Sequence, residues 1–275
     1  MSARRFRLIP ALTIAGAAVT LFAAGCTAPD RSPEALLAGG DIVDLSHAYG
    51  PDTIFWPTAE PFHLETVADG ETPGGWYYAA NNFLGAEHGG THIDAPVHFA
   101  RGRETVDQIP LEHLIGPALL LDVSAGADAD PDYQVTVADL EAWEATHGEM
   151  EDDAILLIRT GFSSRWPDAA RYLGTAERGE AAVPKLHFPG LHPDAARWLV
   201  ANRRLHAIGI DTASIDYGQS SEFGSHRVLY DQNIPAFENL TNLDRLPARG
   251  AIIIALPMKI AGGSGAPLRA VALLR

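Results

Sequence analysis

Apolar and polar positions along this chain follow two periods, one typical of buried strands and one of amphipathic helices. Residues 117–123, 154–159 and 206–210 are nearly continuous apolar runs, which predict buried strands. Residues 136–147 and 193–204 are predicted helices, with Thr136 near the cap of the first and Pro193 in the first turn of the second. Weaker patterns predict strands at residues 41–46, 76–84, 251–256 and 269–274, a helix at 225–232, a solvated linker at 125–132 and a flexible glycine-rich connector at 261–267. Strands that alternate with few helices predict an α/β or α+β fold with a mixed sheet.

The segment from His88 to Phe99 carries the densest group of chemically active side chains. It reads His-Gly-Gly-Thr-His-Ile-Asp-Ala-Pro-Val-His-Phe, so three histidines and an aspartate fall within eleven residues. From residue 91 to residue 99, apolar or small side chains alternate with His92, Asp94 and His98, which predicts an extended segment with one face in the core and one face carrying chemistry. Pro96 is expected to end regular sheet pairing.

Two glycines extend this pattern toward a metal site. Gly89 and Gly90 separate His88 from His92, so the backbone can fold back and aim a third imidazole at the same point. A single histidine on such a face is usually a structural residue, but three histidines and Asp94 on one segment favour ligation. Imidazole and carboxylate together suit Zn²⁺, Mn²⁺ or Fe²⁺.

The beginning of the chain and its charge limit the function further. Residues 1–25 combine three arginines with an apolar run, and small residues precede the single cysteine, Cys26, as in a bacterial lipoprotein signal. A plain secretory signal and an uncleaved anchor helix are the alternatives. Removing this segment leaves 17 basic and 35 acidic residues and a net charge of −18, which argues against nucleic acid as a partner. We expect a signal peptide at residues 1–25, a tether at 26–40 and one domain at 41–275, exported and anchored by lipid to the bacterial membrane.

Candidates for a second half of the site lie more than a hundred residues further along. His226 opens the predicted helix at residues 225–232, and Glu238 lies in a mostly apolar stretch, where an unpaired charge would be costly. His187 and His192 are weaker candidates that could instead cap a helix or line a pocket. Trp56 lies in a proline-rich loop, where a packing role and a contact with a substrate are both open.

The segment from His88 to Phe99 resembles the signature of the metal-dependent cyclase family, which includes bacterial kynurenine formamidases and isatin hydrolases. The resemblance covers about residues 41–275 and includes further pieces in the family's order: Asp44-Leu-Ser-His47, Trp56-Pro57, Gly209-Ile-Asp211 with Ser214 and Asp216, His226, and Glu238-Asn-Leu240. It implies a swivelling β/β/α fold and a homodimer or homotetramer. This chain departs from the formamidases, which are typically shorter and cytoplasmic.

The resemblance also implies a role for each residue. His88, His92 and Asp94 would hold a first metal ion, and His226 would complete a second site that shares Asp94 and Glu238. His98 would be the acid/base and Trp56 would contact an aromatic substrate. The implied cofactor is two divalent ions per chain, Zn or Mn.

These roles predict hydrolysis of an amide or lactam by a metal-activated water, with His98 moving the proton. The expected activity is arylformamidase, which converts N-formylkynurenine to kynurenine and formate in tryptophan catabolism. An isatin-type lactam hydrolase is the near alternative, and a non-catalytic metal-binding lipoprotein is the alternative from another class. Backbone N–H groups near Gly89 or the Ser214 hydroxyl are the candidate oxyanion donors.

Overall fold

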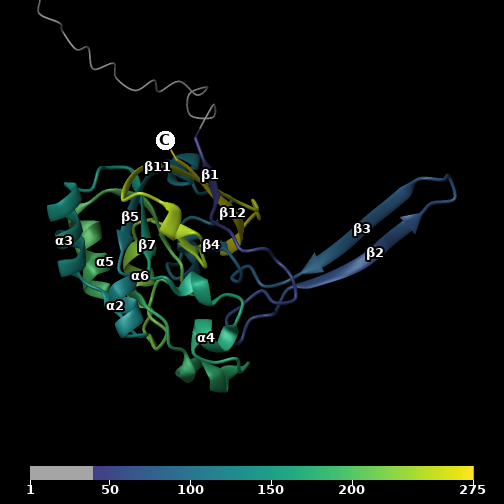
Figure 1. Ribbon diagram of the computed structural model, residues 1–275, viewed down its shortest axis with the longest axis horizontal. Coiled ribbons are helices and arrows are strands. Elements are labelled where there is room, and N and C mark those ends of the chain that lie inside the picture. The colour runs from purple at the N-terminus through teal and green to yellow at the C-terminus, as the bar shows by residue number, and fades with distance from the viewer. Residues whose placement is uncertain (1–39, 275) are drawn as a thin grey trace, which may run out of the picture.

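The chain folds around one closed, barrel-like sheet, which the computed structural model describes for residues 40–274. The strand order is β1-β12-β11-β5-β7-β9-β10-β4, and β4 also pairs with β12, so the seven strands from β12 round to β4 close on themselves (Figure 1). This mixed α/β architecture confirms the predicted fold class.

Three parallel strands form the centre of the sheet: β5 (Ile115–Asp122), β7 (Ala154–Arg159) and β9 (Leu205–Ile210). Along β7, Ile155 and Leu157 face the barrel interior, whereas Leu156 and Ile158 pack under the helices. Both faces are buried, which explains why the strand reads as a continuous apolar run. The predicted bounds of β7 match the structure, and those of β5 and β9 differ by one or two residues.

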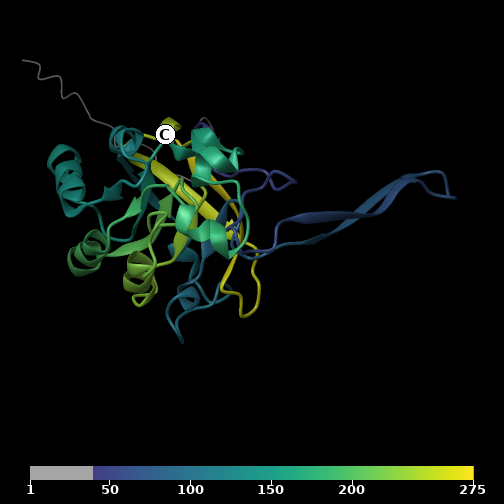
Figure 2. The ribbon, with the colours of Figure 1, turned by 90° about the horizontal axis from the view of Figure 1, so that it is seen from below.

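Helices cover the outside of these strands (Figure 2). They are α3 (Val137–His147), α5 (Pro193–Asn202) and α6 (Gly224–Tyr230). Each contributes a buried leucine to the core between helices and sheet: Leu140, Leu199 and Leu229. Thr136 and Asp139 form a capping box at the start of α3, as the prediction of a cap at Thr136 required.

The remaining strands complete the barrel. The antiparallel group comprises β1 (Ile42–Asp44), β11 (Arg249–Pro257), β12 (Gly265–Leu273) and β4 (His92–Asp94), while β10 (Ala236–Glu238) runs parallel to β9. Two short strands, β6 (Gln134–Val135) and β8 (Gly190–Leu191), pair beside the barrel, and α4 (Ala169–Leu173) packs near the site.

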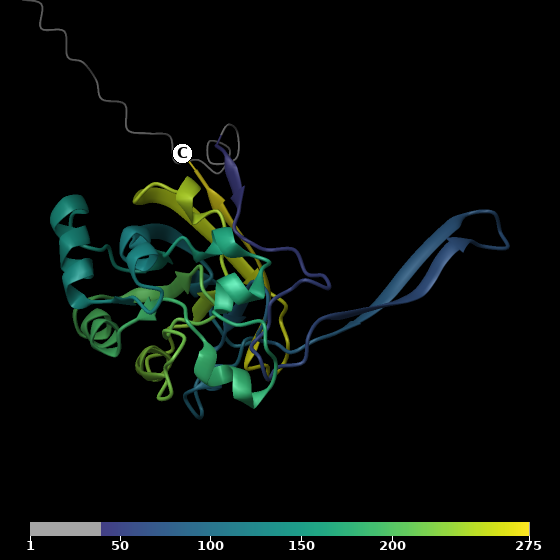
Figure 3. The same ribbon diagram turned by 60° about the horizontal axis from the view of Figure 1, so that its bottom comes forward.

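A long hairpin of β2 (His63–Glu71) and β3 (Tyr77–Leu84) projects away from the barrel (Figures 1 and 3). The sequence predicted β3 but not β2, because β2 carries three acids and a glycine among few apolar residues. When neither face of a strand is covered, its apolar residues do not alternate with polar ones, so the sequence pattern does not reveal it.

Three local predictions are wrong. The extended segment stops at Asp94 and does not continue to Phe99; Pro96 ends the sheet pairing, as expected, and begins a 3-10 turn, Pro96–His98. Residues 125–132 are not a linker: α2 (Ser124–Ala129) begins there, with Ala127 buried and Gly126 against the Tyr133 ring. The connector at 261–267 is shorter than predicted, since β12 begins at Gly265 and pairs with β4.

Within residues 40–274, no helix has both the length and the apolar character needed to cross a bilayer. The predicted signal peptide and tether lie outside the described residues, apart from Gly40.

Candidate metal centre

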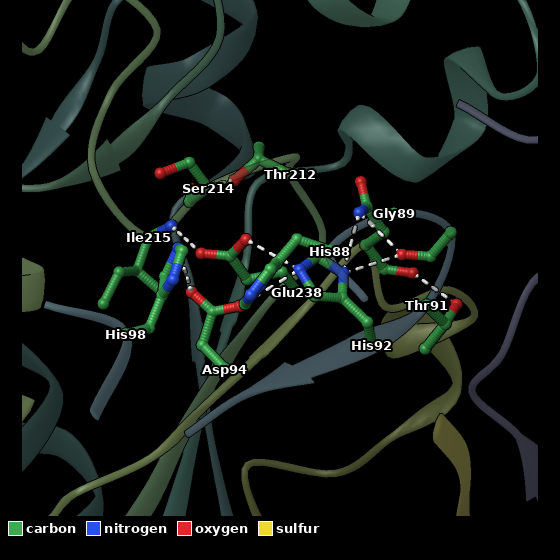
Figure 4. Close-up of polar contacts among 12 residues, drawn as sticks. His88, Gly89, Thr91, His92, Asp94, His98, Thr212, Ser214, Ile215 and Glu238 are labelled. Atoms are coloured by element: carbon green, nitrogen blue, oxygen red, sulfur yellow. Dashed lines mark hydrogen bonds and ion pairs between the residues drawn. The ribbon is translucent and has the colours of Figure 1, made fainter. Parts of the chain in front are cut away.

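All seven residues selected from the sequence line one cavity of about 300 Å³ at one end of the barrel. They are Trp56, His88, His92, Asp94, His98, His226 and Glu238. Figure 4 shows the imidazoles of His88, His92 and His98 around the carboxylates of Asp94 and Glu238. His92, Asp94, His226 and Glu238 are almost fully buried, whereas His98 is partly exposed.

Strand pairing explains how residues so far apart in sequence meet. In the antiparallel pair β4–β10, His92 lies opposite Glu238 and Asp94 opposite Ala236. On the other side of β4, Gly265 of β12 lies opposite Asp94. A Cβ at Gly265 would lie 2.5 Å from His88 Cε1, so glycine is needed for the His88 ring to sit there.

The glycine turn before β4 brings His88 back over the strand. Gly90 has a φ of 57°, a left-handed conformation that favours glycine, and a Cβ there would lie 2.6 Å from the Tyr49 ring. His88 Nδ1 consequently lies 2.6 Å from Asp94 Oδ1. This is the fold-back expected from the two glycines.

The donor atoms form two groups that share one carboxylate. His88, His92 and Asp94 make the first group, and Asp94, His226 and Glu238 make the second; within each, one donor atom per residue lies within 4.8 Å of the others. The oxygens of Asp94 are divided between them, with Oδ1 at 3.1 Å from His92 Nε2 and Oδ2 at 3.4 Å from His226 Nε2.

Outer hydrogen bonds fix which nitrogen of His92 and of His226 carries the proton. His92 Nδ1 donates to the Gly90 carbonyl at 3.0 Å, so Nε2 is the unprotonated nitrogen that faces Asp94 and Glu238. His226 Nδ1 donates to Asp216 Oδ2 at 2.5 Å, which leaves Nε2 toward the same two carboxylates. Carboxylates and carbonyls that accept a hydrogen bond from the outer ring nitrogen of a metal-binding histidine fix its tautomer in this way.

His88 is held by a different relay with the same result. The Ser264 hydroxyl donates to Glu87 Oε2 at 2.7 Å, because a carboxylate can only accept. Its oxygen is then free to accept from His88 Nε2 at 2.9 Å, which leaves Nδ1 unprotonated and directed at Asp94. In the neutral form, all three imidazoles thus present a lone pair to the carboxylates, and this donor set fits divalent metal ions.

The carboxylates and His226 influence each other's protonation. Burial and the charge of Asp94 raise the pKa of Glu238. Burial alone would also raise the pKa of Asp94, but when the surrounding rings carry their second protons, the charge of His88 and hydrogen bonds from His226, His88 and His92 hold that pKa well below its usual range. Burial would lower the pKa of His226, yet Asp216, Asp94 and Glu238 raise it well above its ordinary value. A bound cation would replace that proton as the partner of the carboxylates.

His98 lies beside both groups but belongs to neither. It ends the turn Pro96–His98, its ring stacks on His88 at 3.8 Å between centroids, and its Nε2 is 4.0 Å from Asp94 Oδ2. Burial lowers the pKa of His98 to about 4, although Asp94 opposes this shift. The imidazole is therefore neutral at pH 7 and can accept a proton.

The wall of the cavity is apolar and aromatic. Ile54, Phe55, Trp56, Phe99 and Phe223 line the cavity. Trp56 contacts Phe188 edge to face at 6.4 Å between centroids, so it both packs and lines the cavity. Such a wall suits a flat aromatic molecule and excludes water from the donor atoms.

Several contributing residues were not assigned a role from the sequence. Tyr230 donates to Asp94 Oδ2 at 2.9 Å, and Asn239, held at φ 53°, donates to the Gly90 carbonyl at 2.7 Å. Asp216 accepts from His226 Nδ1 and the Ser264 hydroxyl accepts from His88 Nε2, so each of them orients a metal-binding ring. Only Asn239, beside Glu238, and Asp216, in a run of polar residues after β9, carried a sequence signal.

The weaker histidine candidates lie outside the cavity lining. His187 contacts Asp132 and Gln219, and His192 caps α5 by accepting from the Asp194 N–H. Of the candidate oxyanion donors, the Gly90 N–H is engaged by the Ile54 carbonyl, whereas Ser214 and Gly89 line the cavity.

Comparison with known proteins identifies the family. Residues 43–217 match the model of the Cyclase family, described as "Putative cyclase". An isatin hydrolase of Roseibium aggregatum is 34% identical over 87% of this chain and 94% of its own length, and a kynurenine formamidase of Salinibacter ruber is 30% identical over 84% and 96%. The structure of isatin hydrolase A from Ralstonia solanacearum superposes with a TM-score of 0.79 at 36% identity, covering 90% of this chain and all of that one. The protein therefore belongs to the cyclase family and is a hydrolase.

Proposed function

We propose that this protein hydrolyses a C–N bond in an aromatic amide or lactam with the help of divalent metal ions. The observation that carries the proposal is the orientation of three imidazoles, each with one ring nitrogen directed at Asp94 or Glu238 and the other held by an outer hydrogen bond, in a cavity with an aromatic wall. An isatin-type lactam is our first substrate class, because the isatin hydrolases are 34% and 36% identical to this chain and the formamidase 30%. N-formylkynurenine, the substrate expected from the sequence, is the second.

The residues divide the work as follows. We propose that His88, His92 and Asp94 hold one ion and that His226 and Glu238, with Asp94, hold another, Zn²⁺ or Mn²⁺ in each case. When bound, such an ion lowers the pKa of a coordinated water and polarises a carbonyl. Phe55, Trp56 and Phe99 would hold the aromatic ring and keep bulk water out.

Proton transfer falls to His98. Its neutral ring takes a proton from the attacking water as the C–O bond forms, and returns it to the nitrogen as the C–N bond breaks. A formamide gives a carboxylic acid and an amine as two products, whereas a lactam opens to one product that carries both groups. The Ser214 hydroxyl accepts from the Asp216 N–H at 3.2 Å and has its own hydrogen left to donate to the developing oxyanion.

The test is a substrate panel with purified protein loaded with Zn²⁺ or Mn²⁺. We expect hydrolysis of isatins or N-formyl aromatics, followed by absorbance of the product, with two ions per chain by elemental analysis. Loaded protein that hydrolyses no aromatic amide, lactam or cyclic imide would instead support the non-catalytic metal-binding alternative.

The His98→Ala variant separates the acid/base from the ligands. We expect unchanged metal content and at least ~100-fold loss of kcat, the usual contribution of general acid–base catalysis. Loss of metal in this variant would make His98 a ligand, and normal turnover would remove it from the mechanism. His63→Ala, on the exposed hairpin, is the control for histidine removal.

We also propose that the protein acts as a homodimer or homotetramer and is exported and held at the bacterial membrane by lipid on Cys26. The support for lipidation is the arginine-rich start, apolar run and small residues before the single cysteine. Intact-mass measurement after expression should show cleavage before Cys26 and a diacylglyceryl mass. A Cys26→Ser variant should lack that mass.

A further inference from the structure

A buried tyrosine outside the barrel reaches the residues behind the metal centre. Tyr172 belongs to α4, which lies beside the barrel (Figure 1), and its side chain is fully buried. Its hydroxyl oxygen lies 2.8 Å from Asn239 Oδ1 and 3.1 Å from the Asp211 carbonyl oxygen. Tyr172 does not belong to the cavity lining, so contact with a substrate does not explain a buried hydroxyl at this position.

The side-chain amide of Asn239 can be oriented from its partners. One end of it lies 2.7 Å from the Gly90 carbonyl oxygen, and because a carbonyl only accepts, that end must be the N–H₂ group. Oδ1 therefore faces Tyr172, and since Oδ1 also only accepts, the single hydroxyl hydrogen of Tyr172 is donated to it. Burial and the charges of Asp211 and Glu238 raise the pKa of Tyr172 well above its ordinary value, so the hydroxyl keeps this hydrogen at neutral pH.

The Gly90 carbonyl connects this amide to a metal-binding ring. It accepts from Asn239 Nδ2 at 2.7 Å and from His92 Nδ1 at 3.0 Å, one donor for each lone pair. Asn239 Nδ2 is itself only 3.5 Å from His92 Nδ1. An amide that turned from the carbonyl to the ring would donate to Nδ1, and His92 would then carry its proton on Nε2, the nitrogen that a metal ion needs.

We propose that Tyr172 is a positioning residue, which holds the Asn239 amide on the Gly90 carbonyl and thereby keeps His92 Nε2 free to bind a metal ion. The inference rests on the metal site of the proposed function and adds to it a residue from outside the barrel. The hydroxyl fixes the amide, the amide occupies one lone pair of the carbonyl, and the ring occupies the other. Loss of the first of these bonds therefore loosens the amide beside the ring.

The main chain of Asn239 is held independently of its amide. Its N–H donates to the Thr212 carbonyl at 2.8 Å, and its carbonyl accepts from the Thr91 hydroxyl at 2.7 Å. Its φ of 53° lies in the left-handed region, where asparagine is found more often than most residues. Removal of the Tyr172 hydroxyl therefore frees the amide while both main-chain bonds remain.

The ring of Tyr172 is held by packing that does not involve its oxygen. It meets Trp166 edge to face at 5.3 Å between centroids, and Trp166 in turn stacks on His47 at 4.1 Å. A phenylalanine at this position keeps the ring and these contacts. The Tyr172→Phe variant consequently tests the hydrogen bond alone.

The measurement is chelator competition with Zn²⁺ on the full-length protein and its Tyr172→Phe variant. We expect the first donor group, which contains His92, to lose affinity roughly 3- to 10-fold, less than the ~10–100-fold of a direct outer partner, because Tyr172 acts through a further residue. The second donor group should keep its affinity. Tyr133→Phe is the matched control, since its hydroxyl donates to Asp139 at 2.8 Å beside α3, away from the cavity. This control should change neither affinity.

A double-mutant cycle separates positioning from a general loss of stability. Lower stability leaves the metal affinity of the folded protein unchanged as long as nearly all molecules are folded, which circular dichroism can establish for each variant. Asn239→Gly removes the amide, and glycine adopts the left-handed backbone at no steric cost. If Tyr172 acts through this amide, Tyr172→Phe should cost no further affinity in the Asn239→Gly background.

The outcomes distinguish the relay from the proposed function. A loss below ~3-fold in Tyr172→Phe, an equal loss in Tyr133→Phe, or losses that add in the double variant would overturn the relay and leave the proposed function standing. A wild type without affinity for Zn²⁺ would overturn both. If Asn239→Gly does not fold, the comparison of the two tyrosine variants decides.

Discussion

The Asp216→Asn variant tests whether the outer carboxylate controls the metal-binding state of His226. Asp216 is 2% exposed, and its Oδ2 accepts from His226 Nδ1 at 2.5 Å. An asparagine has the same shape but no charge, and its single carbonyl oxygen accepts from His226 Nδ1 more weakly than the carboxylate does. The ring is then held less firmly in the tautomer that leaves Nε2, the atom that faces Asp94 and Glu238, free to bind metal.

Removal of such an outer partner typically costs 10–100-fold in metal affinity, or about 1.4–2.7 kcal/mol. Chelator competition with Zn²⁺ should show this loss for the group that contains His226, while the group of His88, His92 and Asp94 keeps its affinity. Metal content should fall from about two ions per chain to about one.

The control must account for a second task of Asp216, which also accepts from the Ser225 and His226 N–H groups at the start of α6. Asp139→Asn removes a comparable cap from α3, far from the cavity, where Asp139 accepts from the Thr136 N–H. Both variants should lose about 1 kcal/mol of stability, but only Asp216→Asn should lose metal. Equal metal affinity in wild type and Asp216→Asn would refute the tautomer argument.

Three further predictions concern other contacts. Ser264→Ala removes the group that accepts from His88 Nε2, so metal affinity at the His88 group should fall about 10-fold in chelator competition, and an unchanged affinity would show that the relay does not orient His88. Burial lowers the pKa of His47 to about 4, so the unfolded chain binds more protons and the free energy of unfolding should fall as the pH drops from 6.5 to 4. The full shift corresponds to about 3.4 kcal/mol; after allowance for partial exposure, wild type should lose about 1–3 kcal/mol more than His47→Gln in urea titrations, whereas parallel pH curves would contradict this. Finally, dialysis against a chelator should abolish hydrolysis and lower Tm, and Zn²⁺ or Mn²⁺ should restore both, because ligands that bind only the native state stabilise it.

The local pattern of the sequence determined the elements that are buried. Continuous apolar runs are recognisable because β5, β7 and β9 are covered on both faces, and Thr136 and Pro193 marked the starts of α3 and α5. The chemistry of the His88–Phe99 segment was recognisable for a similar reason, since its residues are close in sequence and the two glycines permit the tight turn that folds His88 back. Elements without a burial pattern, such as β2 and α2, were missed.

The tertiary structure decided what the chain brings together over long separations. Glu238 faces His92 only because β10 pairs with β4, and Ser264 reaches His88 only because β12 lies on the other side of β4. Residues were selected from the sequence by chemistry and resemblance, but the orientation of each imidazole depends on Asp216, Ser264 and the Gly90 carbonyl. Strand register and hydrogen-bond direction are properties of pairs of segments, and no single segment of sequence contains them.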